Sequence, residues 1–146
     1  MTTIAMDKNG LIAYDSRETA GSTIVDDNCN KCKESNGVYY FLCGRSADED
    51  TLIDAVENGE RSSYPDAIST HAIIVMGGEV YTAGITKEDG YYWQKERKGN
   101  PLSRGSGADH AMTAMDLGCS AKKAVKYAMK RDSCTGGKIR TFSLKG

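Results

Sequence analysis

The sequence predicts an α+β fold, in which strands and helices are segregated into separate layers. Most of the chain before residue 105 consists of short apolar and β-branched runs between turn residues, with a helical period at only one place. Two helical periods then follow one another before a last apolar run. The 146 residues show no internal repeat and suit one core, so residues 1–146 are predicted to form a single domain.

The strands are predicted from apolar runs that end at turn residues. Residues 2–15 predict a β-hairpin, because two apolar runs flank the turn-forming pair Asn9-Gly10. Val38–Cys43 is an unbroken apolar and aromatic run, typical of a strand buried on both faces. Further strands are predicted at residues 71–76 and 79–83, which form a second hairpin, once within 85–104, and at 138–144.

Three helices are predicted. The first follows Ser46 as its N-cap, has three acidic residues in its first turn and ends at Asn58-Gly59. Residues 59–70 are polar and turn-rich and predict a loop. The other two helices are predicted to run from Ala108 to Leu117 and, capped by Ser120, from there to Arg131.

Charge and composition exclude several classes of protein. With 19 Lys+Arg and 20 Asp+Glu the net charge is −1, and no basic stripe indicates binding to nucleic acid. The longest apolar runs fall far below the ~18 residues that a membrane span needs. The N-terminus lacks the features of a secretory signal, and five unevenly spaced cysteines do not suit a disulfide framework. We therefore expect a cytoplasmic protein without nucleic-acid or membrane partners.

Two short motifs have ordinary structural explanations. Cys29 and Cys32 form a C-x-x-C pair, but a zinc site needs about four ligands, and the other cysteines and the two histidines are scattered. We predict two buried cysteines here and no metal. Gly105-Ser-Gly107 precedes a predicted helix, whose N-terminal amides favour anions, yet it lacks the Gly-Lys-Ser/Thr of a phosphate-binding loop. It predicts a tight strand-to-helix turn, and no cofactor is expected.

Thr2 is a candidate nucleophile. A small residue behind the initiator Met1 favours removal of that methionine, which would leave a threonine with a free α-amine. Such a residue carries its own base, because the hydroxyl attacks while the amine accepts the proton. Many proteins begin in this way, so the weight of the observation depends on partners elsewhere in the chain.

Such partners occur in a recognisable order. Asp15-Ser-Arg-Glu-Thr-Ala-Gly21, followed by Lys31, resembles the proteasome β-subunit signature, and the wider pattern is similar to the peptidase subunit of the bacterial HslV–HslU protease. Both are N-terminal nucleophile hydrolases. Three further stretches resemble motifs of this family in the same order, namely Phe41-Leu-Cys-Gly44-Arg-Ser-Ala-Asp48, Gly105-Ser106-Gly107 and Arg131-Asp132-Ser-Cys-Thr135-Gly136-Gly137.

The resemblance implies a fold, an activity and partners. The fold is a four-layer αββα sandwich of two antiparallel sheets. The activity is that of a threonine peptidase, which would cleave peptide bonds once methionine aminopeptidase had removed Met1, the one residue before Thr2. The family also implies a homo-oligomer that acts on protein or peptide substrates, with an ATP-dependent unfoldase as a partner. Residues 59–71 leave no room for the family's second long helix, which we expect to be missing.

The resemblance also implies the site residues and their roles. Thr2 would be the nucleophile, Lys31 a cation beside its hydroxyl, and Asp15 the partner that holds Lys31 charged. Backbone N–H of Gly44 would stabilise the oxyanion. A network supporting the Thr2 amine would comprise Ser106, Asp132 and Thr135.

Substrate contacts follow from the same alignment. Thr19 would lie on the strand that pairs with the substrate backbone. Arg45 would stand near the substrate, where the family has a small residue. The first specificity pocket would be lined by Cys29, Leu42 and Ser46, which makes it medium-sized and nearly neutral. We therefore expect a preference for uncharged, apolar side chains.

Two alternative functions remain open on the sequence. The first is a catalytically inactive relative that keeps the fold and acts as a binding or regulatory module. The missing helix favours this hypothesis. The second is an amidase for small molecules, which an open monomer would suit better than a closed ring. Retention of a full set of catalytic residues favours the peptidase over both, since a scaffold has no need of Thr2, Asp15, Lys31, Ser106 and Asp132 together.

Overall fold

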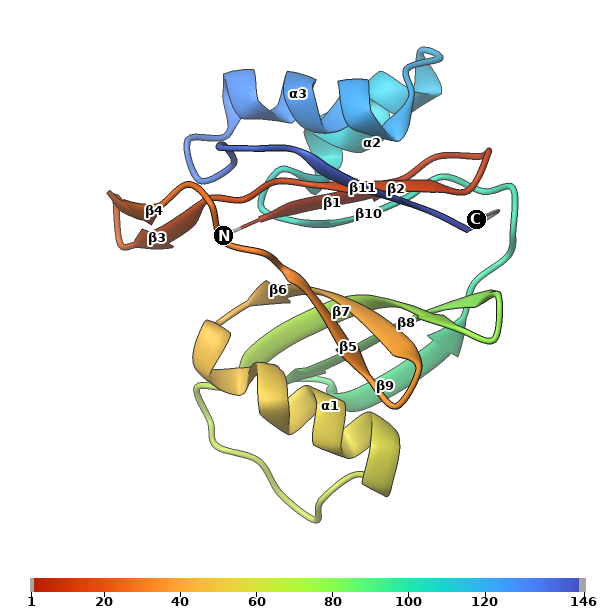
Figure 1. The fold of residues 1–146 in the computed structure, drawn as a ribbon. Helices are drawn as coiled ribbons and strands as arrows, with labels where there is room; N and C mark the ends of the chain where they lie inside the picture. Colours follow the sequence, from red (N-terminus) through yellow and green to blue (C-terminus); the bar gives the residue numbers. More distant parts are fainter. Residues whose placement is uncertain (1, 145–146) are drawn as a thin grey trace. The chain divides into compact units, whose positions relative to one another are not determined.

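The computed structural model describes residues 2–144, and the chain divides into two compact units. Unit 1 contains the chain up to Lys31 and again from Arg97 onward, and unit 2 comprises Cys32–Glu96. Each unit combines one main antiparallel sheet with helices on its surface (Figure 1). The predicted α+β class is therefore confirmed, while a single domain over residues 1–146 stays a prediction.

The main sheet of unit 1 brings together the first and last strands of the chain. Its order is β10-β1-β2-β11, with every neighbour antiparallel. The predicted hairpin is confirmed as β1 (Thr3–Met6) and β2 (Leu11–Tyr14). On its two sides it pairs with β10 (Leu102–Gly105) and β11 (Arg140–Ser143). Segments that lie a hundred residues apart in the sequence thus share one sheet.

Helices α2 (Ala108–Asp116) and α3 (Ala121–Arg131) cover one face of this sheet (Figure 1). Small side chains form the contact, since alanines of β1 and β2 pack against alanines of both helices, a close approach that larger residues would prevent. Both helices lie where the sequence predicts them. The predicted cap of α3 is also confirmed, because Ser120 Oγ accepts a hydrogen bond from the backbone N–H of Lys123.

A short hairpin, which the sequence analysis did not predict, follows β2. Strands β3 (Glu18–Ala20) and β4 (Thr23–Asp26) form a sheet of their own, and the register shifts between Glu18 and Thr19. Every residue of β4 is exposed. The hairpin has no buried face, and the alternation by which strands are recognised in a sequence is therefore missing.

Unit 2 is a five-stranded meander with one helix on a face. Its strands pair in chain order and are β5 (Cys32–Ser35), β6 (Val38–Gly44), β7 (Ser69–Met76), β8 (Glu79–Thr86) and β9 (Gly90–Lys95). Helix α1 (Glu49–Asn58) packs Leu52 and Ala55 into a cluster with Tyr40 and Leu42. The prediction of one strand within residues 85–104 is wrong, because β9 and β10 both lie there.

The start of α1 also differs from the prediction. A 3₁₀ turn, η1 (Ser46–Asp48), precedes the helix, so Ser46 is not its N-cap. Asp48 stands at that position but makes no side-chain cap, since its carboxylate accepts a hydrogen bond from Ser69 N–H at 3.1 Å instead. Residues 59–68 contain no helix, which confirms the predicted loop and the missing second helix.

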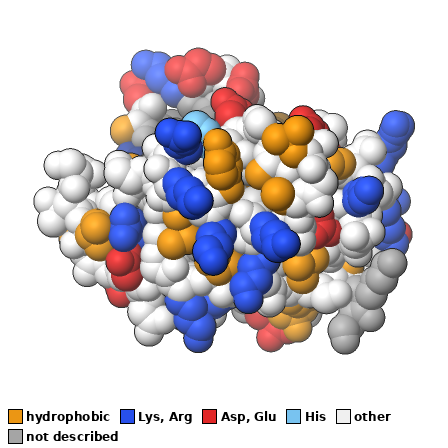
Figure 2. All heavy atoms as spheres, turned by 90° about the horizontal axis from the view of Figure 1, so that it is seen from above, with side chains coloured by type: hydrophobic (Ala, Val, Ile, Leu, Met, Phe, Trp, Pro, Cys, Tyr) orange, Lys and Arg blue, Asp and Glu red, His pale blue; other side chains and the backbone are white. Residues whose placement is uncertain are grey.

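Helix α3 carries a strongly basic outer face. Its eleven residues include five cations and no acid, and all five cations are exposed: Lys122, Lys123, Lys126, Lys130 and Arg131. Figure 2 shows blue side chains gathered on the face above this helix layer. The expectation of no basic stripe is therefore wrong for α3, because the helical turn gathers cations that apolar residues separate in the sequence. None of the helices within residues 2–144 is long and apolar enough to cross a membrane.

Candidate active site

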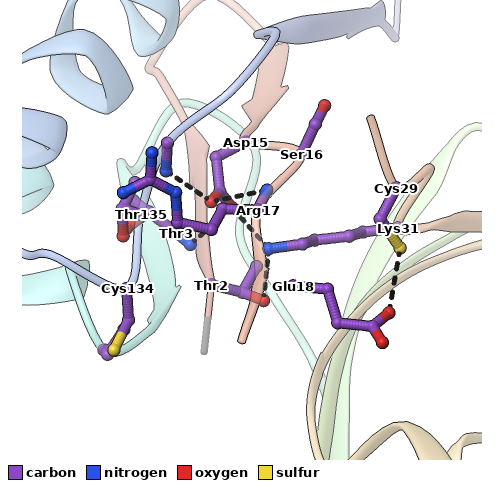
Figure 3. A network of polar contacts seen from close by, with 12 residues as sticks. Thr2, Thr3, Asp15, Ser16, Arg17, Glu18, Cys29, Lys31, Cys134 and Thr135 are labelled. Atoms are coloured by element: carbon purple, nitrogen blue, oxygen red, sulfur yellow. Dashed lines mark hydrogen bonds and ion pairs between the residues drawn. The ribbon is translucent and has the colours of Figure 1, made fainter. Parts of the chain in front are cut away.

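The predicted nucleophile, Thr2, lies beside the predicted lysine in unit 1. Lys31 Nζ donates hydrogen bonds to Thr2 Oγ1 and to Asp15 Oδ1, each at 2.8 Å (Figure 3). All three residues are buried, with exposed fractions of 4% for Thr2, 7% for Lys31 and 0% for Asp15. A buried ammonium and carboxylate are stable only when they are paired, and here the pair places a cation against the threonine hydroxyl.

Backbone donors fix the carboxylate of Asp15. Its Oδ1 accepts from Thr3 N–H at 3.0 Å as well as from the lysine, and its Oδ2 accepts from Gly136 N–H at 3.0 Å and Arg17 N–H at 3.3 Å. These donors come from the first strand, the segment after β2 and the loop after α3. Because both oxygens are saturated with donors, Asp15 is held in one orientation and remains a suitable counter-ion for Lys31.

A second network, centred on Asp132, lies at the end of α3. Asp132 Oδ2 accepts from Ser106 Oγ at 2.5 Å and from Thr135 Oγ1 at 2.6 Å, and Oδ1 accepts from Cys134 N–H at 3.0 Å. Burial opposes ionisation, but these hydrogen bonds outweigh it and hold the pKa of Asp132 below its ordinary value. The structure thus brings together the three residues that the resemblance groups around the Thr2 amine.

Thr3, which the sequence analysis did not single out, extends this network to the first strand. Thr3 Oγ1 lies 2.7 Å from Thr135 Oγ1 and is fully buried. Since the Thr135 hydroxyl donates its proton to Asp132, the Thr3 hydroxyl donates to Thr135. The resulting chain of hydrogen bonds links the residue next to the candidate nucleophile with Asp132.

The Gly105-Ser-Gly107 turn is shaped by its contacts with the first strand. A side chain at Gly105 would lie 1.9 Å from the carbonyl oxygen of Thr2, and one at Gly107 would lie 2.1 Å from Thr3 Oγ1. Gly105 also has φ +104°, which favours glycine. The predicted strand-to-helix turn is confirmed, and its glycines allow the backbone to approach residues 2 and 3 closely.

Two arginines tie the segment before Lys31 to the rest of unit 1. Arg17 forms a bidentate pair with Asp27, at 2.8 and 3.1 Å. These hydrogen bonds raise the pKa of Arg17 and lower the pKa of Asp27. Arg140 of β11 donates to Asn28 Oδ1 at 3.0 Å and to the carbonyl oxygen of Cys29 at 3.1 Å. Residues 27–31 have no regular secondary structure, so these side chains take the place of a strand ladder in positioning Lys31.

A carboxylate and a thiol meet next to this segment. Cys29 Sγ lies 3.6 Å from Glu18 Oε2 and donates to it (Figure 3). Burial raises the pKa of the Cys29 thiol, and the hydrogen bond and the charge of Glu18 raise it further. Cys29 and Cys32 are half-buried, so the prediction of two buried cysteines is wrong. Among residues 2–144 no group of three or more His, Cys, Asp or Glu could hold a metal ion.

The remaining predicted site residues are distributed over both units. Thr19 is half-buried on β3 of unit 1. In unit 2, Gly44 ends β6 with φ +104°, Arg45 donates to the carbonyl oxygen of Ala67, and Ser46 is exposed on η1. The Leu42 side chain is 1% exposed and packs in the core cluster beneath α1. Its place in a specificity pocket stays a prediction.

Sequence reasoning missed several residues that the structure places around the site. Arg17 stands within the Asp-Ser-Arg motif, so its position offered a signal, and Gly136 lies in the Gly-Gly pair of the last motif. Glu18 lies inside the Asp15–Gly21 motif but was given no role there, and no local pattern marks Arg140. Their contacts depend on how distant segments meet, which the spacing of residue types does not encode.

The class of fold follows from a comparison with solved structures. The chain matches the crystal structure of eukaryotic HslV from Trypanosoma brucei with a TM-score of 0.74, over 97% of this chain and 98% of that one, at 19% identity. At this identity the match shows the fold alone, an α+β sandwich like that of the HslV structure. The predicted fold is therefore confirmed.

Curated sequences give a second comparison. The chain is 27% identical over 168 residues to the proteasome subunit beta type-8 of Canis lupus familiaris, which covers 92% of this chain and 61% of that protein. It is 29% identical over 179 residues to the Homo sapiens subunit of the same name, covering 99% of this chain and 65% of that protein. No family model matches. The chain spans less than two thirds of the length of these relatives, and its resemblance to proteasome β subunits and HslV is confirmed.

Proposed function

We propose that the protein is a threonine peptidase that uses Thr2 as its nucleophile. One observation carries the proposal: the buried Lys31 ammonium donates to the Thr2 hydroxyl and to Asp15 at the same time. A cation held against a hydroxyl lowers the cost of forming an alkoxide, which is what nucleophilic attack requires. The similarity to proteasome β subunits and to HslV supports a peptidase at the level of the family.

The proposed reaction has two steps and needs a free α-amine on Thr2. In the first, Thr2 Oγ1 attacks the peptide carbonyl while the amine takes the hydroxyl proton. The C–N bond then breaks, the proton passes to the leaving amine, and an ester to Thr2 remains. In the second, water attacks the ester, its proton passes through the same amine, and the threonine hydroxyl is restored. An unperturbed α-amine, with a pKa near ~7.7–8.0, suits this role at neutral pH.

The Asp132 network would support that amine. Asp132 stays ionised because three donors bind its carboxylate, so a negative charge remains near the start of β1 in the fold. The hydroxyls of Ser106 and Thr135 would hold the amine or relay its proton. Asp132 would then stabilise the ammonium that forms in each step, as a carboxylate does in other catalytic triads.

Other parts of the proposal rest on the resemblance alone. Gly44 N–H would stabilise the oxyanion, and Thr19 would pair with the backbone of a bound peptide. Cys29, Leu42, Arg45 and Ser46 remain proposed substrate contacts. A homo-oligomer that receives protein substrates from an ATP-dependent unfoldase, in the cytoplasm, completes the proposal.

The test combines an intact mass with two substitutions. We expect the purified protein to have lost Met1, and to cleave fluorogenic peptides. Thr2→Ala should abolish this activity, whereas Thr2→Ser should keep a measurable part of it because the hydroxyl and the amine both remain. Thr113→Ala, on the exposed side of α2, is the matched control and should leave the rate unchanged.

Any of three results would overturn the proposal. Full retention of Met1 would leave no free amine on Thr2. Peptide cleavage at an unchanged rate in Thr2→Ala would assign the activity to another group. A folded protein with exposed Thr2 and no hydrolysis of any peptide would favour the binding-module function instead.

A further inference from the structure

Glu18, in the segment before Lys31, makes no ion pair with any described residue. Asp15 pairs with Lys31, and Asp27 pairs with Arg17. Glu18 contacts the Cys29 thiol instead. Because burial and the neighbouring carboxylate keep that thiol protonated, it donates a hydrogen bond without adding a compensating charge. Glu18, Asp15 and Lys31 together leave one net negative charge.

The position of Glu18 relates it to the candidate nucleophile through two short segments of unit 1. Along one, it lies three residues after Asp15, whose carboxylate holds Lys31. Along the other, its contact Cys29 lies two residues before Lys31. Figure 3 shows the Glu18–Cys29 contact in the same close view as the Lys31 contacts with Thr2 and Asp15, with no dashed line joining the two groups. A carboxylate thus stands at the edge of the cluster that would perform the chemistry.

The local backbone separates Glu18 from the regular hairpin. The register of the β3–β4 pair shifts between Glu18 and Thr19, and such irregularities redirect side chains and recur beside active sites. Glu18 is half-buried, so its carboxylate is both partly shielded from water and open to a ligand. In such an environment a charged hydrogen bond is stronger than at a fully exposed position.

We propose that Glu18 determines substrate specificity by binding a cationic side chain, lysine or arginine, next to the bond that is cleaved. This replaces the expectation of a nearly neutral pocket, which considered Cys29, Leu42 and Ser46 but not Glu18. Of those three, Leu42 lies in the core of unit 2 and Cys29 presents its thiol to Glu18. The inference rests on the proposed peptidase function and names its substrate class.

The test measures kcat/KM on three peptides that differ only in the residue before the cleaved bond: arginine, leucine or aspartate. The wild-type protein should prefer arginine over leucine by about tenfold, the effect of one good charged hydrogen bond. Glu18→Gln should remove that preference, so that the ratio of kcat/KM between the arginine and leucine peptides falls to about one. Glu18→Lys should favour the aspartate peptide. Glu88→Gln removes the same charge from the exposed turn before β9 and should change nothing.

A binding measurement separates this inference from the proposed function. Thr2→Ala, which lacks the nucleophile, should bind the arginine peptide about tenfold more tightly than the leucine peptide in a fluorescence anisotropy titration, and Glu18→Gln in that background should abolish the difference. If the arginine peptide binds more tightly through Glu18 but the wild-type protein hydrolyses no peptide, the peptidase proposal is overturned and the role of Glu18 in binding is kept. Equal cleavage and equal binding of the arginine and leucine peptides, or a preference that survives Glu18→Gln, would overturn the role of Glu18.

Discussion

At the scale of single residues, the site depends on Thr3 as much as on the residues that the family resemblance identifies. Thr3 donates its backbone N–H to Asp15 and its hydroxyl to Thr135. It therefore belongs to both networks, the one around Lys31 and the one around Asp132. A residue adjacent to the nucleophile thus couples the orientation of the two carboxylates.

Thr3→Val tests the hydroxyl of Thr3. Valine keeps the shape and the backbone N–H, but it removes the donor to Thr135 inside a fully buried site. We expect a loss of about 1 kcal/mol in the free energy of unfolding, measured in urea. Thr113→Val removes a comparable hydroxyl on the exposed side of α2 and should cost less. Equal losses for both variants would contradict a special role of Thr3.

Asp132→Asn tests the pH dependence of stability. The pKa of Asp132 is lowered in the folded protein, so its contribution is fully present above the unfolded pKa near ~3.9 and is lost as pH falls through the lower, folded value. We expect the variant to be about 1 kcal/mol less stable than wild type at pH 7, after allowance for partial exposure, and the difference to shrink as the pH is lowered to 2. Urea unfolding at both pH values measures this. A difference that grows on acidification would contradict the assignment.

At the scale of elements, the Gly105-Ser-Gly107 turn explains how α2 meets the first strand. Gly107→Ala would bring a methyl group to 2.1 Å from Thr3 Oγ1, so one of the two must move. We expect a loss of about 2 kcal/mol, typical of overpacking, by urea unfolding. In a Thr3→Ala background the same change should cost markedly less, since the clashing atom is absent. Strict additivity of the two substitutions would show that the contact is not responsible.

The sequence predicts those elements that have a buried face. Helices α2 and α3 and the β1–β2 and β7–β8 hairpins follow from apolar periodicity, because each packs one face into a core. Strands β4 and β5 are exposed or half-exposed and lack that pattern. The 3₁₀ turn before α1 ends at Asp48, whose carboxylate accepts a hydrogen bond from the distant Ser69 N–H. Long-range contacts of this last kind are not encoded in local spacing.

The candidate site likewise contains residues that the sequence predicts and residues that only the structure identifies. The order of motifs predicts Thr2, Asp15 and Lys31, and the structure places them together. The motif around Asp15 includes Glu18 but does not indicate its contact, and Arg140 lies in no motif. Both residues contact Cys29, which the sequence pattern does not predict. Spacing identifies residues that a family shares, whereas the contacts of an individual chain require its fold.

At the scale of the whole molecule, the charge is unevenly distributed. The net charge is −1, yet α3 presents five exposed cations (Figure 2). A local field of this kind attracts anionic surfaces even when the net charge is negative. The basic face is therefore expected to dominate how the protein binds to charged materials.

Ion exchange tests this expectation. At pH 7 and low salt we expect the protein to be retained on a sulfonate resin, and replacement of Lys122, Lys126 and Lys130 by Gln to send it into the flow-through, because the field of α3 is weakened. Replacement of the exposed Lys8, Lys87 and Lys98 by Gln gives the same net charge and should leave retention largely intact. Equal loss in both variants would show that net charge, not its distribution, decides.

Unit 2 lies between the two parts of unit 1 in the sequence, which determines when each unit can fold during translation. Unit 2 is one continuous stretch, whereas unit 1 needs both the first 31 residues and those after residue 96. A ribosome that adds about 5–20 residues per second delivers β11 on the order of ten seconds after Lys31. Until then Thr3 has no Thr135 to bond, and Asp15 lacks the Gly136 donor. The first strand translated is thus among the last to be enclosed. Until then a nascent chain contains Thr2 without the hydrogen-bonding partners that its proposed reaction needs.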